Sequence, residues 1–173
     1  VACNLLVSAS GQAEVESGEE PIVLQCGTIQ SPADLVYQGY VSAVDYINKN
    51  AEGQLEIQLF HSGQLGGQDT MSQDVQQGQY AIGQSSAAIL ASFYEPIGIL
   101  SAPYIFRDAD HLMSVMNGEI GQDLYAKVEE NADIKIISTW YYGTRHLTSN
   151  IPGSTPEELQ GVKMRIYNAP IAY

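Results

Sequence analysis

A strand–helix–strand pattern in residues 21–60 constrains the fold of this chain more than any other feature. The run 21–28 (PIVLQCGT) is short and apolar, and 54–60 (QLEIQLF) alternates apolar with polar residues, so both are predicted strands. Ser31 as the N-cap and Pro32 at the first helical position predict a helix between them. Its apolar residues recur at helical spacing: Val36, Tyr40, Ala43, Val44 and Ile47. Two strands joined by a helix form a parallel unit, which predicts an α/β fold.

The alternation of helices and strands continues along the chain. The expected elements are a glycine-bearing loop at 61–68, a helix at 69–77, a strand at 80–86, an apolar segment at 97–106, a helix capped by Asp108, a helix at 119–131 and a strand at 134–140. Beyond Gly143 we expect a short strand, a helix that begins at the capping box of Thr155 and Glu158, and a strand at 162–166.

The chain stops at Tyr173, one strand into a new unit, as an N-terminal fragment of a longer protein would. We therefore expect a nearly complete first α/β lobe at 21–138 and the incomplete start of a second lobe at 139–173. Residues 1–20 are expected to lie outside both lobes.

The charge balance excludes some partners. Seven basic residues against twenty acidic ones give a net charge of −13, which repels nucleic acid and anionic membrane surfaces. An anionic ligand is still allowed, because a contact between arginine and a carboxylate inside a cleft is local and weakly screened.

The first twenty residues indicate export. VACNLLVSAS is small and apolar, as the end of a signal peptide would be, and GQAEVESGEE is typical of a disordered linker. Cys3 fits the acylated cysteine of a bacterial lipoprotein, and the alternative is ordinary cleavage near Ala9 or Ala13. Cys26 lies in an apolar run, so a buried free thiol is favoured over a disulfide with Cys3. No run is long enough to span a membrane.

No catalytic pattern emerges from the sequence. The histidines are His61, His111 and His146, and His111 in DADH fits a helix start with acidic residues at its positive end. The chain has no nucleophile elbow, phosphate-binding loop or cysteine pairs for zinc. We therefore expect neither an enzyme nor a metal or other cofactor.

Two of the three arginines are Arg145 and Arg165. Arg165 lies in the apolar run VKMRI, and a buried arginine needs a charged partner. That partner is either an internal carboxylate, such as Glu157 or Asp133, or a ligand carboxylate gripped by two parallel hydrogen bonds.

Five motifs in register make residues 21–173 resemble the extracytoplasmic solute receptors of tripartite ATP-independent periplasmic (TRAP) transporters, the DctP type. They are GQLEIQLFHSGQLGG (53–67), QQGQYAIGQSS (76–86), ILSAPYIFRDADH (99–111), YYGTRHLTSN (141–150) and TPEELQGVKMR (155–165). The resemblance implies a periplasmic-binding-protein-like receptor with two α/β lobes that close over a ligand.

The resemblance also implies ligand-binding residues. Arg165 occupies the position that anchors the substrate carboxylate, Arg145 the position of a second arginine that faces or supports the site, and Asn168 a polar contact. Loops after the first-lobe strands line the opposite wall, which implies Gln30, Gln64, Ser85 and Ser86. This agrees with the rule that ligands bind beyond the carboxyl ends of parallel strands. Sialic-acid receptors of the family tend to be acidic near the position of Ser86, so the serine weakens that assignment.

The function implied is capture of an organic acid outside the cytoplasmic membrane, by a monomer. The receptor would deliver the acid to TRAP permease subunits for uptake driven by an ion gradient. The alternative is a periplasmic ligand sensor of the same fold that feeds a signalling partner. Turnover of an ester or glycoside would indicate a hydrolase instead.

Overall fold

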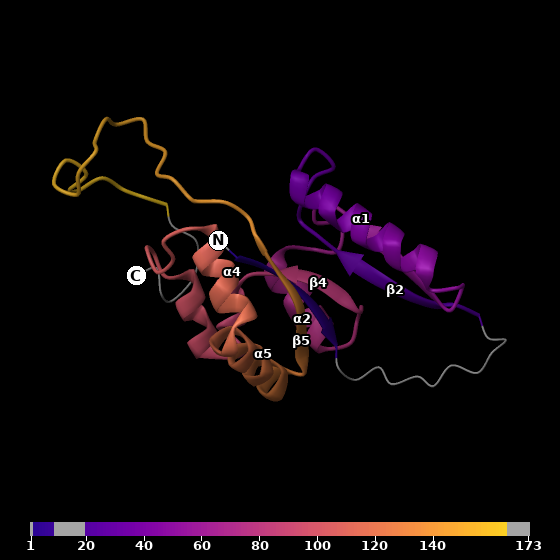
Figure 1. Cartoon of the computed structure of the whole chain (residues 1–173). Helices are drawn as coiled ribbons and strands as arrows, with labels where there is room; N and C mark the ends of the chain where they lie inside the picture. The colour runs from indigo at the N-terminus through magenta and orange to yellow at the C-terminus, as the bar shows by residue number, and fades with distance from the viewer. Residues whose placement is uncertain (1, 9–19, 166–173) are drawn as a thin grey trace.

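The computed structural model describes residues 2–8 and 20–165, which build a five-stranded sheet with helices on both of its faces (Figure 1). The strand order is β3-β2-β4-β1-β5. The bounds are β1 Ala2–Ser8, β2 Ile22–Gly27, β3 Leu55–Phe60, β4 Ile82–Ser85 and β5 Ile134–Tyr141. β2 is parallel to β3 and β4, whereas β1 is antiparallel to β4 and β5. β5 therefore points the same way as the parallel strands, and the predicted α/β class is confirmed.

The helices pack in two hydrophobic clusters. Their bounds are α1 Leu35–Asn50, α2 Gln68–Gln76, α3 Ala87–Leu90, the 3-10 helix η1 Glu95–Ser101, α4 Ala109–Asn117 and α5 Glu119–Ala132. One cluster joins α1 to β2, β3 and β4, and the larger joins α2, α3, η1, α4 and α5 to β5. Figure 1 shows α1 well apart from the pair α4 and α5.

The predicted strand–helix–strand unit is confirmed as β2-α1-β3. Tyr40 and Val44 are buried on α1, as the helical spacing predicts. The predicted cap is wrong: α1 begins at Leu35, and Asp34 is its N-cap. The backbone N–H and the hydroxyl of Ser31 both donate to Asp34 Oδ2, at 2.8 and 2.9 Å, so Ser31 closes a turn ahead of the helix.

The later helices also agree with the sequence. Asp108 is the N-cap of α4, and its Oδ1 accepts a 2.7 Å bond from the backbone N–H of His111. Met71, Met116 and Val128 are fully buried on α2, α4 and α5. These positions follow from the 3.6-residue period of an amphipathic helix.

Cys26 is a free cysteine in β2, and the residue is 2% exposed. The predicted buried thiol is confirmed. Burial disfavours the thiolate and raises the pKa of Cys26 to about 12.

The N-terminal residues differ from their prediction. Ala2–Ser8, assigned above to a leader and linker outside both lobes, form β1 between β4 and β5. Four residues of β1 pair with β4 and seven with β5, so β1 is an interior strand of the sheet. Without β1, the facing edges of β4 and β5 would have unpaired backbone N–H and C=O groups, and the apolar run Ala2–Ser8 pairs with both edges. Neither export nor acylation of Cys3 is tested by this placement.

The segment after β5, residues 142–165, contains no helix or strand, although both were predicted there. The capping box does form its bonds: Glu158 Oε2 accepts from Thr155 N at 3.3 Å, and Glu158 N donates to Thr155 Oγ1 at 3.4 Å. Only a turn follows, because most side chains of this connector are exposed and have no core to pack against. Figure 1 shows the connector looping out from the body.

No helix among residues 2–8 and 20–165 is both long and apolar enough to cross a membrane.

Candidate functional site

The carboxyl ends of the parallel strands bring three loops together at one edge of the sheet. The loop after β3 is tied to the loop after β2, because Ser62 N donates to Gln30 O at 2.8 Å and Gly63 N donates to Thr28 O at 3.0 Å. We call the residues that follow β2, β3 and β4 at this end the binding edge.

Thr28 and Gln84 hold the binding edge together. Thr28 Oγ1 donates to Gln84 Oε1 at 2.6 Å, and Ile29 N donates to the same oxygen at 3.1 Å. Thr28 and Gln84 are 0% and 1% exposed, respectively. Both residues were missed by the sequence analysis. A glutamine inside the apolar run YAIGQSS was the available signal, since a buried amide needs partners.

Gln30 presents an unpaired donor at the binding edge. The residue is 4% exposed, its backbone N–H donates to Thr28 Oγ1 at 3.1 Å, and its Oε1 accepts from the hydroxyl of Tyr142 at 3.1 Å. Its Nε2 finds no acceptor among residues 2–8 and 20–165. A buried donor without an acceptor costs about 1–3 kcal/mol, so this position favours an oxygen atom supplied from outside the chain.

The other predicted loop residues differ in exposure. Ser86 is partly exposed at the start of α3, and Gln64 is exposed, with its Oε1 accepting from His61 N at 3.2 Å. Ser85 is fully buried, and its hydroxyl lies 2.8 Å from that of Ser72 on α2. Gln30, Gln64 and Ser86 thus lie at the binding edge. Ser85 is buried at the end of β4, where it bonds to α2 instead of facing the edge.

The predicted cationic residues lie in the connector instead. Arg145 and Arg165 are both exposed, and Arg165 belongs to no strand. The prediction that Arg165 lies in a buried strand is therefore wrong for the described residues, because the run around it has no neighbouring strand to pair with. Asn168 lies outside the described residues.

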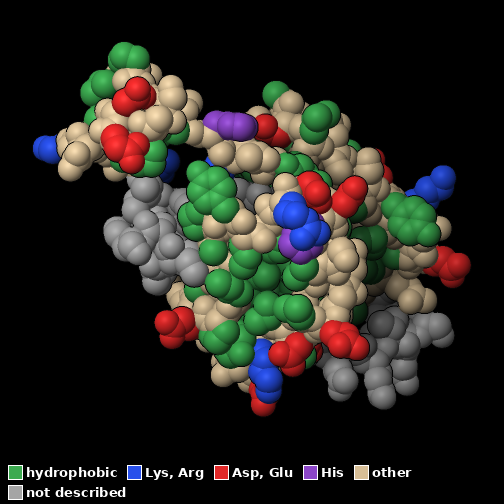
Figure 2. All heavy atoms as spheres, turned by 60° about the vertical axis from the view of Figure 1, so that its left-hand side comes forward, with side chains coloured by type: hydrophobic (Ala, Val, Ile, Leu, Met, Phe, Trp, Pro, Cys, Tyr) green, Lys and Arg blue, Asp and Glu red, His purple; other side chains and the backbone are tan. Residues whose placement is uncertain are grey.

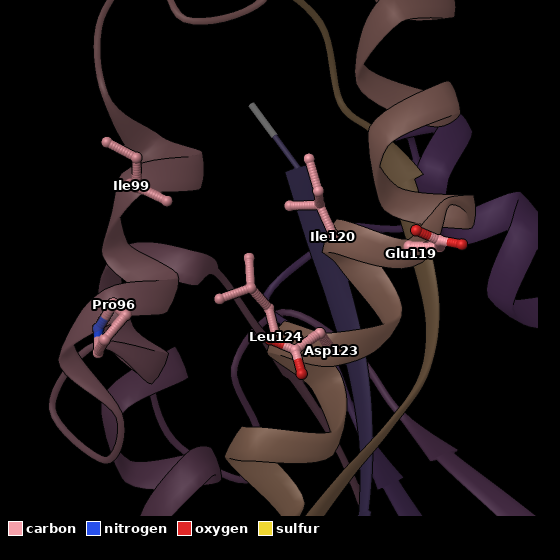
Figure 3. Close-up of a pocket in the computed structure, with 6 residues that line it drawn as sticks. All are labelled: Pro96, Ile99, Glu119, Ile120, Asp123 and Leu124. Carbon is pink, nitrogen blue, oxygen red and sulfur yellow. The ribbon is translucent and has the colours of Figure 1, made fainter.

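Away from the binding edge, a hollow of about 620 Å³ opens between η1 and α5. Figure 3 shows Ile120 and Leu124 pointing from α5 toward the side of Pro96 and Ile99. Figure 2 shows hydrophobic side chains gathered on the face that carries these helices. The carboxylates of Glu119 and Asp123 also line the hollow and would repel an acid, so the binding edge is the better candidate for an anionic ligand.

No cluster of three or more His, Cys, Asp or Glu side chains that could hold a metal ion occurs within 20–165. A lobe with a parallel sheet and polar loops at its carboxyl edge is typical of a protein that binds a solute.

The sequence model of one family, described as bacterial extracellular solute-binding protein, family 7 (DctP), matches residues 26–173, and the chain belongs to that family. The family description is that of solute-binding proteins rather than enzymes, and the predicted resemblance is confirmed.

Three relatives illustrate the match. The 2,3-diketo-L-gulonate-binding periplasmic protein of Escherichia coli K12 is 30% identical over 128 residues, which cover 73% of this chain and 39% of that protein. A TRAP periplasmic solute-binding protein of Citrobacter koseri, solved with D-glucuronate, is 27% identical with a TM-score of 0.79, covering 87% of this chain and 50% of that one. A TRAP protein of Polaromonas sp. JS666, solved with D-erythronate, is 32% identical with a TM-score of 0.58, covering 64% and 36%.

The chain thus spans half or less of each of these relatives. The periplasmic-binding-protein fold class is confirmed by the solved neighbours, which are periplasmic solute-binding proteins.

Proposed function

We propose that this protein captures an organic acid outside the cytoplasmic membrane and delivers it to a TRAP membrane permease. The observation that carries the proposal is the buried, unpaired amide donor of Gln30 at the carboxyl edge of the sheet. Relatives solved with D-glucuronate and D-erythronate support an acid as the ligand class.

In this proposal the two parts of the chain meet around the acid. Gln30, Gln64 and Ser86 of the lobe 21–138 contact its hydroxyl or carboxyl oxygens. Arg165, with Arg145 beside it, grips the carboxylate from the unit that starts at 139. Asn168 adds a polar contact on the arginine side.

Ligand-driven closure accounts for the exposure of the arginines in the described structure. A ligand that contacts both units binds the closed state more tightly than the open state and shifts the population toward closure. The guanidinium of Arg165 is exposed here and would leave water only when the acid bridges it to the binding edge.

The proposal predicts that Arg165→Ala in the full-length protein weakens binding of D-glucuronate. A hydrogen bond to a charged group contributes about 1.5–3 kcal/mol, so Kd should rise about tenfold to a hundredfold in a calorimetric titration.

Lys163→Ala is the matched control for this titration, because Lys163 is an exposed cation two residues away. It should leave Kd within about twofold of the unsubstituted protein, since exposed charges contribute little at physiological salt. Equal losses of affinity in the two variants would show that Arg165 acts only through the net charge of the protein. An unchanged Kd in Arg165→Ala would refute its role in binding.

A further inference from the structure

Tyr142 links the connector to the binding edge. It is the first residue after β5, and its hydroxyl donates to Gln30 Oε1, 112 residues earlier in the chain, at 3.1 Å. Its neighbour Trp140 packs on Tyr40 of α1, with ring centroids 4.7 Å apart. The end of β5 therefore approaches α1 and the loop that follows β2.

The backbone of Gln30 is already fixed on both sides. Its N–H donates to Thr28 Oγ1 at 3.1 Å, and its carbonyl accepts from Ser62 N at 2.8 Å. The remaining freedom is rotation of the side-chain amide, which exchanges the places of an acceptor oxygen and a donor nitrogen.

The hydroxyl of Tyr142 removes that freedom. It donates to Oε1, and Nε2 is then left without an acceptor among the described residues, although Gln30 is only 4% exposed. A buried donor held in one orientation is suited to an acceptor oxygen that arrives with a ligand.

We propose that Tyr142 is a positioning residue for ligand binding, which holds the Gln30 amide so that Nε2 donates to an oxygen of the bound acid. Tyr142 does this without touching the acid. The inference rests on the proposed function, because it assigns a donor to the same site. It also couples the connector, which carries Arg145 and Arg165, to the sheet edge through one hydrogen bond.

Four variants of the full-length protein test the role of Tyr142 by titration with D-glucuronate. Tyr142→Phe should raise Kd about threefold to tenfold, the loss expected for one neutral hydrogen bond. Gln30→Ala should raise Kd by at least as much. The double variant should bind as weakly as Gln30→Ala alone, because Tyr142 acts through Gln30. Gln30→Glu should bind more weakly than Gln30→Ala, since a carboxylate still accepts from Tyr142 but repels the acid.

Tyr141→Phe is the matched control for Tyr142→Phe. Tyr141 is the preceding residue, similarly exposed, and its hydroxyl lies 2.9 Å from Thr144 Oγ1 instead of the binding edge. It should leave Kd unchanged. Thermal unfolding without ligand separates a loss of stability from a loss of binding, and the melting temperature of Tyr142→Phe should stay close to that of Tyr141→Phe.

Losses that add in the double variant, or unchanged binding by Tyr142→Phe, would overturn the role of Tyr142 and leave the proposed function in place. Failure of the unsubstituted protein to bind D-glucuronate, D-erythronate or succinate would overturn both.

Discussion

At the scale of single residues, buried polar side chains define the binding edge. Thr28, Gln30 and Gln84 are each at most 4% exposed, yet all carry groups that need hydrogen-bond partners. Thr28 donates to Gln84 between β2 and β4, whereas Gln30 Nε2 has no acceptor among the described residues and is the donor proposed to face a ligand. The proposed function therefore implies that affinity at this edge depends partly on residues that a ligand does not touch.

Thr28→Val tests the tie between β2 and β4. Valine keeps the shape of threonine but removes the donor to Gln84 Oε1 and the acceptor for Gln30 N. The free energy of unfolding should fall by about 1–3 kcal/mol in urea denaturation, since buried polar atoms lose a partner. Thr144→Val, in the exposed connector, should change it by less than about 0.5 kcal/mol. Equal effects in the two variants would contradict the assigned role.

Cys26 predicts a specific pH dependence. Burial raises the thiol pKa from 9.0 to about 12, so the unfolded chain loses this proton at lower pH than the folded chain. The contribution of the thiol to stability is therefore complete below about pH 9 and is lost as pH rises toward 12, by at most about 1.4 kcal/mol per pH unit.

Cys26→Ala isolates this effect from the tyrosines, because both proteins carry the same tyrosines. Above pH 9 its unfolding free energy should fall less steeply with pH than that of the unsubstituted protein. Parallel pH profiles would show that the thiol does not stay protonated in the fold.

At the scale of elements, the helices and strands that depend on local sequence patterns were predicted, whereas a strand that depends on distant partners was not. The helix α1 and the strands β2 and β3 follow from periodicities contained within residues 21–60, and they were predicted. The position of β1 depends on partners at 82–85 and 134–141, which no local pattern reveals. The strand expected at 162–166 had an apolar sequence but gains no paired neighbour among the described residues.

β1 can be tested directly against the leader interpretation of residues 1–20. Leu5 pairs with Gln84 on one side and Ser138 on the other, so Leu5→Pro should remove ladder bonds and lower the free energy of unfolding by about 3 kcal/mol or more. Deletion of residues 1–19 should destabilise the protein at least as strongly. If neither variant changes the free energy of unfolding, residues 2–8 do not contribute to the sheet and the leader interpretation stands.

At the scale of the whole molecule, the sheet and the connector divide the proposed site. In the proposed function, residues 21–138 supply the amide and hydroxyl groups of the binding edge, and the segment from 139 supplies the arginines. The family resemblance implied Gln30, Gln64, Ser85 and Ser86 as ligand contacts, and all four lie in or beside the loops at the carboxyl ends of the parallel strands, where such ends meet. Their contact with a ligand stays a prediction. The hydrogen bond from Tyr142 to Gln30 joins residues 112 apart and could only come from the structure.

The most direct test of the whole account is a thermal-shift screen of the full-length protein with matched acids and neutral compounds. The panel pairs D-glucuronate with D-glucose and D-erythronate with erythritol, and adds succinate. A ligand at a hundred times its Kd stabilises the folded state by about 2.7 kcal/mol, which gives a clear rise in melting temperature. At least one acid should raise the melting temperature while its neutral partner does not. A rise with the neutral compounds alone would contradict an acid receptor and leave the arginines without their proposed role.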